Sequence, residues 1–374
     1  MKERINKNIF IFVFMFAIVS VTSIYSASLY TSKELGNLAV KQTVWYLIGL
    51  CIVLCIIKLK NNFLYNNTWN FYGIGIFLLA LLLLFGVPIN NSRCWFVIPG
   101  IGSFQPSEFM KLFIMLALAK LISNFRSKKP NPSLYDEFIF IIKSLVAVLL
   151  PAILTFLQPD TGAVIIYLVI YVFMMFFSGI RMRWFLIALL FIVFGLGIFG
   201  GIYFFNENLF VEIFGTSMYY RMERLFMWKS GTGLQLENAI AAIGSAGFVG
   251  HGFNKTPIYF PESSTDFIFA VFASNFGFAG VLILVFLLVL FDIYIISLVK
   301  KNGNNTNKYI LAGILGMLLF QQIQNIGMTV GLFPITGITL PFISYGGSSL
   351  ISYMVIIGIL VNISSEKGKK YKYN

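Results

Sequence analysis

The sequence predicts an all-α polytopic membrane protein with about ten transmembrane helices and both termini in the cytoplasm. The first observation is the composition, because 58% of the 374 residues are hydrophobic and only 11% are charged. A soluble domain is about one quarter charged, so most of this surface must face lipid. The second observation is a series of long apolar runs, and the third is the placement of basic residues between them.

Each apolar run is long enough to cross a hydrocarbon layer of about 30 Å. The expected spans are 9–29, 42–58, 70–89, 107–124, 138–157, 162–180, 184–205, 267–298, 309–331 and 345–363. The first run follows Lys2, Arg4 and Lys7 as in a signal peptide, but it is too long for the apolar core of one. We therefore expect an uncleaved anchor and a single membrane domain over residues 1–374.

The basic residues indicate the orientation, because cytoplasmic loops are enriched in lysine and arginine. With a cytoplasmic N-terminus every inside segment is basic, including Lys58 and Lys60, Arg181 and Arg183, and Lys300 and Lys301. The short outside loops hold only Lys33, Lys41 and Arg93. Both termini are therefore expected inside.

The longest outside segment is 206–265, between the seventh and eighth spans, and it far exceeds an ordinary connection. We expect it to be a large extracytoplasmic loop. Within it, 236–250 is rich in small and apolar residues, which favours an interfacial or re-entrant helix.

The same inventory excludes several classes of function. The net charge of +13 does not indicate nucleic-acid binding, since the basic residues form no single stripe with interleaved aromatics. One histidine and three cysteines exclude a multi-histidine metal site and a disulfide framework. The sequence has no Walker motif, no dinucleotide-binding glycine pattern and no HExxH motif. These exclusions leave a transporter or a membrane-embedded enzyme that acts at the outer face.

Charged residues within membrane spans are costly, so each is a candidate for function. Glu108, Lys111, Asp160 and Asp266 all map to the outer half of the membrane, whereas Asp292 lies toward an inner end and is expected to reach water. Glu108 and Lys111 are three residues apart, so they share a helix face and can pair. They form either an internal ion pair or the wall of a polar cavity in which Lys111 contacts an anionic ligand.

Asp160 and Asp266 each precede a span, where an aspartate commonly caps the helix, so capping and ligand contact are both open. The last outer loop, 334–349, has two prolines, paired glycines and hydroxyl residues such as Ser344, which exclude a plain helix. Irregular backbone at membrane depth lines a cavity or is buried in protein. The loop therefore predicts a substrate groove or close helix packing.

Six motifs in this order resemble those of the SEDS family of bacterial cell-wall proteins, the group of RodA, FtsW and SpoVE, over nearly the whole chain. They are RCW at 93–95, QPSE at 105–108 with Lys111, QPDTG at 158–162, GFVGHG at 247–252, PE at 261–262 with TDFIFA at 265–270, and the loop 334–349. The sequence NIGM at 325–328 is more similar to RodA than to FtsW.

The resemblance implies an enzyme that polymerises lipid II into glycan strands at the outer face of the bacterial cytoplasmic membrane. It also implies a class b penicillin-binding protein as partner, within an elongation or division complex. By the resemblance Asp266 is catalytic, and an inverting displacement on lipid II would use such a carboxylate as general base. No cofactor is required, and a divalent cation, Mg²⁺ or Mn²⁺, is compatible but not demanded.

The pyrophosphate leaving group needs cationic stabilisation, and the interfacial belt beside it favours an aromatic residue. The residues expected to bind substrate are Lys111, Glu108, Asp160, Trp95, Arg221, Arg224 and Ser344. We expect a groove open sideways to lipid, with Asp266, Lys111 and at least one of the two arginines on a shared wall. A lipid II flippase and a scaffold for the penicillin-binding protein are the alternatives. Asp266 at the outer water boundary favours the enzyme, since a flippase needs no base.

Overall fold

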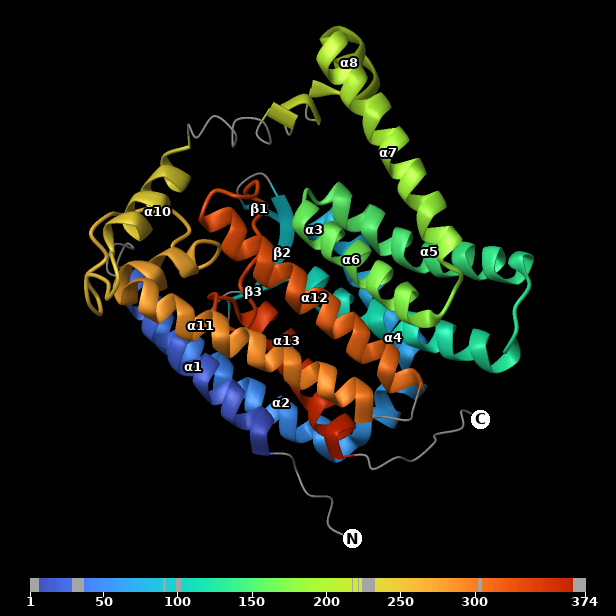
Figure 1. Ribbon diagram of the computed structural model, residues 1–374, viewed down its shortest axis with the longest axis horizontal. Coiled ribbons are helices and arrows are strands. Elements are labelled where there is room, and N and C mark those ends of the chain that lie inside the picture. The colour runs from blue at the N-terminus through green and yellow to red at the C-terminus, as the bar shows by residue number, and fades with distance from the viewer. Residues whose placement is uncertain are drawn as a thin grey trace.

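The computed structural model of the protein describes residues 7–28, 37–89, 92–98, 102–216, 218–220, 222–223, 233–301 and 305–365. Its long helices are α1 (Lys7–Ala27), α2 (Leu38–Asn66), α3 (Thr68–Phe85), α4 (Pro106–Lys128), α5 (Leu134–Leu157), α6 (Thr161–Ser178), α7 (Met182–Phe205), α11 (Ile268–Lys301), α12 (Asn305–Thr329) and α13 (Gly347–Ser365). Two shorter helices, α8 (Glu207–Phe214) and α10 (Leu234–Ser245), lie between α7 and α11 (Figure 1).

Within the described residues, nine helices are long and apolar enough to cross a membrane. The tenth expected span is α4, which is 23 residues long but carries charges at both ends. We count α4 as a span because it packs inside the bundle, against α3, α6, α12 and α13. The prediction of an all-α polytopic membrane protein is confirmed, and the beginning of α1 and the end of α13 lie at the same end of the bundle (Figure 1). Which end faces the cytoplasm stays a prediction.

The core of the bundle is built on α12 and α13. In the most apolar 18-residue stretch of each helix, 78% and 72% of the residues are buried. α13 packs along α2, and α12 packs between α6 and α11. Asp292 corrects one expectation here, because it is only 4% exposed and does not reach water. Its Oδ1 accepts a hydrogen bond from Gln322 Nε2 at 3.4 Å, so the carboxyl group faces α12 inside the protein.

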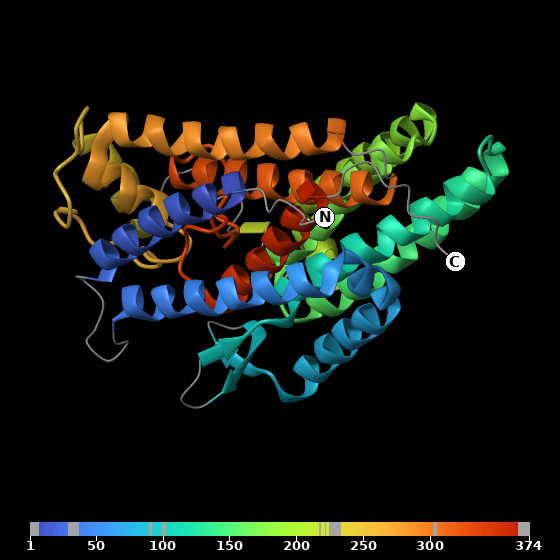
Figure 2. The same cartoon turned by 90° about the horizontal axis from the view of Figure 1, so that it is seen from below.

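A small antiparallel sheet connects α3 to α4, which the sequence analysis did not predict. Its strands are β1 (Val87–Ile89), β2 (Ser92–Ile98) and β3 (Gly102–Phe104), in the order β1-β2-β3. Figure 2 shows it at one side of the bundle, beside α3. The Cys94 thiol of β2 donates a hydrogen bond to Gln158 O at 3.0 Å, which ties the sheet to the end of α5.

The predicted helix in the large loop is α10, which begins two residues before the expected 236–250 segment and ends at Ser245. The turn that follows α10 packs against a break in α11 at Gly277, where φ is 61°. A side chain at Gly277 would clash with the backbone of Gly250, so glycine is required there. The turn satisfies the backbone groups freed by the break: His251 N donates to Ser274 O, Gly252 N to Asn275 O, Phe278 N to Gly247 O and Ala279 N to Phe248 O.

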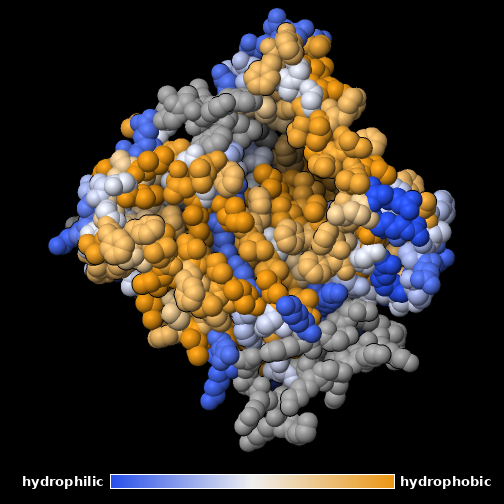
Figure 3. Space-filling view, viewed as in Figure 1, coloured by the Kyte–Doolittle hydropathy of each residue, from blue (hydrophilic) through white to orange (hydrophobic). Residues whose placement is uncertain are grey.

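α7 stands apart from the bundle and has no buried residue. It is held at its first turn, where Trp184 Nε1 donates a hydrogen bond to Glu137 Oε2 of α5 at 2.8 Å. Figure 1 shows α7 running away from α5 toward α8, and Figure 3 shows the surface hollowed between α7 and the helices beside it. The rim of this recess is mostly apolar (Figure 3).

Candidate active site

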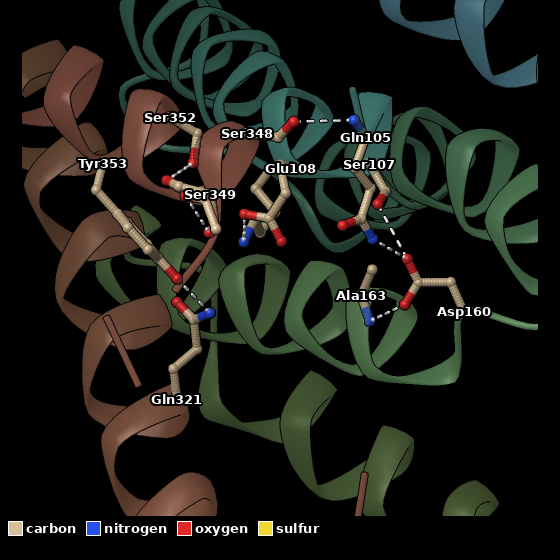
Figure 4. Close-up of polar contacts among 12 residues, drawn as sticks. Gln105, Ser107, Glu108, Asp160, Ala163, Gln321, Ser348, Ser349, Ser352 and Tyr353 are labelled. Carbon is tan, nitrogen blue, oxygen red and sulfur yellow. Dashed lines mark hydrogen bonds and ion pairs between the residues drawn. The ribbon is translucent and has the colours of Figure 1, made fainter. Parts of the chain in front are cut away.

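Glu108 and Lys111 form the ion pair that their spacing predicts. Lys111 Nζ lies 2.6 Å from Glu108 Oε2, and the two side chains are 2% and 12% exposed. The ammonium group also lies over the ring of Tyr353, 5.4 Å from its centroid. The Tyr353 hydroxyl in turn accepts a hydrogen bond from Gln321 Nε2 at 2.8 Å (Figure 4). A buried charge is tolerated only with such partners, so the pair and the ring form one unit.

Asp160 caps α6, as one of the two interpretations of the sequence predicts. Its Oδ1 accepts a hydrogen bond from Ala163 N at 3.1 Å. Its Oδ2 accepts from Gln105 Nε2 and Ser107 Oγ, both at 3.0 Å, so it also fixes the start of α4 (Figure 4). Burial raises the pKa of Asp160, and the hydrogen bonds oppose that rise. This carboxyl group is therefore fully engaged in holding two helix ends together.

The loop before α13 has the irregular backbone that its sequence predicts. Residues 332–346 form no helix, and α13 begins only at Gly347. The loop packs closely on the start of α6, since a side chain at Gly162 would lie 2.9 Å from Thr336 O. Tyr46 of α2 donates a hydrogen bond to Phe342 O at 2.6 Å from the other side. The loop is thus held between α2 and α6, inside the bundle.

The backbone around Asp266 is bonded at three successive carbonyl groups. Tyr345 N donates to Ser264 O at 2.9 Å, and Ser344 Oγ donates to Thr265 O at 2.6 Å. The carbonyl of Asp266 itself accepts from Asn325 Nδ2 at 2.8 Å. Because the donors come from the loop and from α12, the position of Asp266 depends on both.

The carboxyl group of Asp266, by contrast, makes no hydrogen bond to any residue that the structure describes. It therefore does not cap α11. Its Oδ2 faces Gly337, where a side chain would lie 3.6 Å away and where φ is +68°. Burial, with a smaller contribution from the nearby Glu262 carboxylate, raises the pKa of Asp266 to about 7. Such a group can lose and gain a proton near neutral pH.

The loop lies between the two charged groups. Gly337 borders Asp266, while the side chain of Thr339, two residues later, contacts Tyr353 beside Lys111. One short stretch of irregular backbone therefore separates the unpaired acid from the buried cation. This juxtaposition supports the expectation that Asp266 and Lys111 serve one site.

Of the four remaining candidates, the structure describes two, Trp95 and Ser344. Trp95 is half-buried in β2, opposite Val87. Ser344 is buried, and its hydroxyl accepts from Leu340 N at 2.8 Å as well as donating to Thr265 O. Substrate binding by these two residues stays a prediction. Arg221 and Arg224 lie outside the described residues, so the expected shared wall stays a prediction as well.

Two neighbours of the site, Tyr353 and Gln321, were not singled out by the sequence analysis, and Asn325 was noted only as part of the NIGM motif. The polar run at 321–325 within an otherwise apolar span was the available signal, since polar groups in a span need partners. The optional divalent cation stays untested. In the described ranges, no three His, Cys, Asp or Glu side chains lie together.

Comparisons with known proteins identify relatives over nearly the whole chain. A sequence profile described as "cell cycle protein", for FtsW, RodA and SpoVE, matches residues 6–369. The probable peptidoglycan glycosyltransferase FtsW of Haemophilus influenzae is 31% identical over 96% of this chain and 89% of its own length. The stage V sporulation protein E of Bacillus subtilis is 33% identical over 80% of this chain and 79% of its own.

Solved structures agree with these relatives. The crystal structure of the rod shape determining protein RodA of Thermus thermophilus matches with a TM-score of 0.70 and 26% identity, over 98% of this chain and 99% of that one. A chain from the work described as "Structural coordination of polymerization and crosslinking by a peptidoglycan synthase complex" matches with a TM-score of 0.79 and 27% identity, over 97% and 98%. The relatives include FtsW, SpoVE and RodA, so the greater similarity to RodA stays a prediction.

Proposed function

The chain belongs to the FtsW, RodA and SpoVE family of cell cycle proteins, and from this we propose that it polymerises lipid II into glycan strands. It is a multi-pass membrane protein and a peptidoglycan glycosyltransferase. The reaction takes place at the outer face of the bacterial cytoplasmic membrane. The observation that carries the proposal is the Asp266 carboxyl group, which is unpaired among the described residues although its backbone is firmly held.

Asp266 acts as the general base in an inverting displacement. The 4-hydroxyl of the acceptor sugar attacks C1 of the donor sugar, and its proton passes to the Asp266 carboxylate as the new glycosidic bond forms. The bond between C1 and the pyrophosphate oxygen breaks, and undecaprenyl pyrophosphate leaves. A pKa of about 7 supports this role, since a base is most effective when its pKa lies near the working pH.

Lys111, Arg221 and Arg224 supply positive charge to the leaving pyrophosphate. Lys111 is buried and bonded to Glu108, so it acts on the substrate from a fixed position, as the positive end of the Glu108–Lys111 pair beside Tyr353. The isoprenoid tail enters from lipid, and the apolar recess beside α7 is the surface that suits it (Figure 3).

The partner is a class b penicillin-binding protein that cross-links the glycan product. One solved structural relative comes from a peptidoglycan synthase complex that couples polymerisation to crosslinking, which supports this assignment. An elongation complex and a division complex both suit the family relatives named above.

Purified protein, incubated with lipid II with and without its penicillin-binding partner, tests the proposal directly. Glycan strands separated on a gel are the expected product. The outcome that contradicts the enzyme is an absence of strands together with transfer of lipid II across vesicle membranes, which is what the flippase alternative predicts.

A further inference from the structure

Asn325 lies in the last turns of α12 and is completely buried. Its side-chain nitrogen donates two hydrogen bonds, to Asp266 O at 2.8 Å and to Ile338 O at 2.7 Å. An amide nitrogen carries two hydrogens, so both are used. The two acceptors belong to the turn that carries Asp266 and to the loop before α13.

We propose that Asn325 is a positioning residue for glycosyl transfer, because it joins these two segments and thereby fixes the Asp266 carboxyl group against Gly337. The inference rests on the proposed role of Asp266 as base. Ile338 follows Gly337 directly, so a bond that holds the Ile338 carbonyl also holds the backbone that the carboxyl group faces. The Asn325 side chain donates hydrogen bonds only to backbone carbonyl groups, and it acts on the reaction through Asp266.

The geometry explains why the side chain is asparagine. Its planar amide directs two hydrogens in diverging directions from one atom, which serine, threonine and leucine do not offer. The residue is itself anchored, since Thr329 Oγ1 donates to Asn325 O at 2.7 Å. A misplacement of about 1 Å can lower an enzymatic rate by about 10²-fold. A fixed distance between the Asp266 turn and the loop at Gly337 therefore has a large effect on the rate.

One feature of Asn325 favours a role in geometry over a role in stability alone. Its Oδ1 is buried and has no hydrogen-bond partner among the described residues. A buried acceptor without a partner is costly. The amide of Asn325 thus has partners for both hydrogens but none for its oxygen. Both hydrogens bond the segments around Asp266, which is where the side chain has its effect.

The neighbouring Gln324 provides a matched control. Its Nε2 donates to Pro334 O at 2.9 Å and to Thr336 Oγ1 at 3.1 Å, which belong to the same loop. It has no bond to the turn that carries Asp266. Removing the Gln324 amide loosens the loop without releasing Asp266, whereas removing the Asn325 amide does both.

The test compares Asn325→Leu with Gln324→Met in the full-length protein together with its penicillin-binding partner, with lipid II as substrate. Both changes nearly preserve side-chain volume and remove only the amide. Measured quantities are kcat, the apparent KM for lipid II, the thermal unfolding midpoint and the pH dependence of kcat. We expect Asn325→Leu to lower kcat by about 10²-fold with an apparent KM within about twofold of the wild type.

The pH dependence separates positioning from a structural role. Without the two hydrogen bonds of the Asn325 amide, Asp266 meets more water and its pKa falls from about 7. The acid limb of kcat therefore moves to lower pH in Asn325→Leu. Gln324→Met should leave that limb in place. Equal losses of kcat in both variants, or a loss in Asn325→Leu with an unmoved pH profile, would overturn the inference.

If Asn325→Leu does not fold, Asn325→Ser keeps one donor and should give an intermediate loss of kcat, while wild-type kcat in that variant contradicts the inference. Asp266→Asn distinguishes a failure of the proposed base from a failure of the role of Asn325. Wild-type polymerisation by Asp266→Asn refutes the proposed base, whereas an inactive Asp266→Asn beside a fully active Asn325→Leu refutes only the role of Asn325.

Discussion

The two charged regions of the site are held in opposite ways. At the start of α4 and α6, the side chains themselves are paired: Lys111 with Glu108, and Asp160 with a backbone amide and two polar side chains. At Asp266 the backbone is paired while the carboxyl group is not. At α4 and α6 the charged groups are used in contacts that fix the structure. At Asp266 the carboxyl group is held in a fixed place but remains available. The difference supports the proposal that Asp266 reacts and that the paired region binds.

The largest effect is expected from Asp266→Asn, which tests the reacting side of the comparison. Loss of a general base lowers kcat by about 10²–10⁴-fold. The amide is nearly isosteric and the carboxyl group makes no described hydrogen bond, so the thermal unfolding midpoint should hardly change. Gel analysis of glycan products from purified protein provides the measurement. Near-normal synthesis by this variant would contradict the assignment of Asp266 as the general base.

The next effect tests the paired side, through Glu108→Lys combined with Lys111→Glu. Each single change leaves like charges buried together, and breaking a buried pair costs about 3–5 kcal/mol. The double swap restores an opposite-charge pair, so we expect it to fold. We expect it to stay inactive, because the positive charge has moved toward the more exposed position. Recovery of polymerisation in the double variant would reduce the pair to a structural element.

A smaller effect is expected from Asp160→Ala, which removes the cap of α6. Loss of such a cap costs about 1 kcal/mol, and loss of the bonds from Gln105 and Ser107 adds to this cost. Asp160→Asn keeps an acceptor and should cost less. Ser133→Ala is the control, since Ser133 caps α5 in a capping box on the exposed surface. Thermal unfolding of the three variants provides the comparison. A fall in kcat for Asp160→Ala that exceeds its fall in stability would show a direct role in binding.

The smallest effect concerns the pH dependence. Glu262 disfavours the ionised form of Asp266, so it contributes to the raised pKa of that carboxyl group after burial. Glu262→Gln removes the negative charge, and the pKa of Asp266 should fall. The base form then persists to lower pH, so the acid limb of kcat should move to lower pH. A profile of kcat against pH decides the matter, and a shift to higher pH would contradict the assignment of that limb to Asp266.

Local rules predict much of this structure. Spans follow from apolar length, the Glu108–Lys111 pair from three-residue spacing, and the irregular loop from its prolines and glycines. Each of these features depends on residues that are close in sequence, or on the preference of apolar side chains for lipid over water. The helix α10 belongs to the same group, since its small apolar residues are contiguous.

Contacts between distant segments were not predictable in this way. The strands β1 and β3 are three residues each, too short for a period-two pattern to appear. Asp292 was expected at water because it lies toward a helix end, yet its partner Gln322 on α12 keeps it inside. Asn325 of α12 joins the turn that carries Asp266 to the loop before α13, and no spacing in the sequence reveals that these segments meet.

The charges of α4 have a consequence for how the protein is made. α4 carries Glu108 and Lys111 near its start and Arg126 and Lys128 in its last turn, and it falls short of the apolar character of the other spans. A charged residue costs an inserting helix about 2.5–3.5 kcal/mol at its centre and less near its ends, where a long side chain reaches water. These charges together should therefore make α4 pass poorly from the translocon into the bilayer by itself. It packs against α3, to which the small sheet joins it. We therefore expect α3 and α4 to enter the bilayer together as a hairpin during synthesis, with Lys111 neutralised by Glu108 before the rest of the bundle exists.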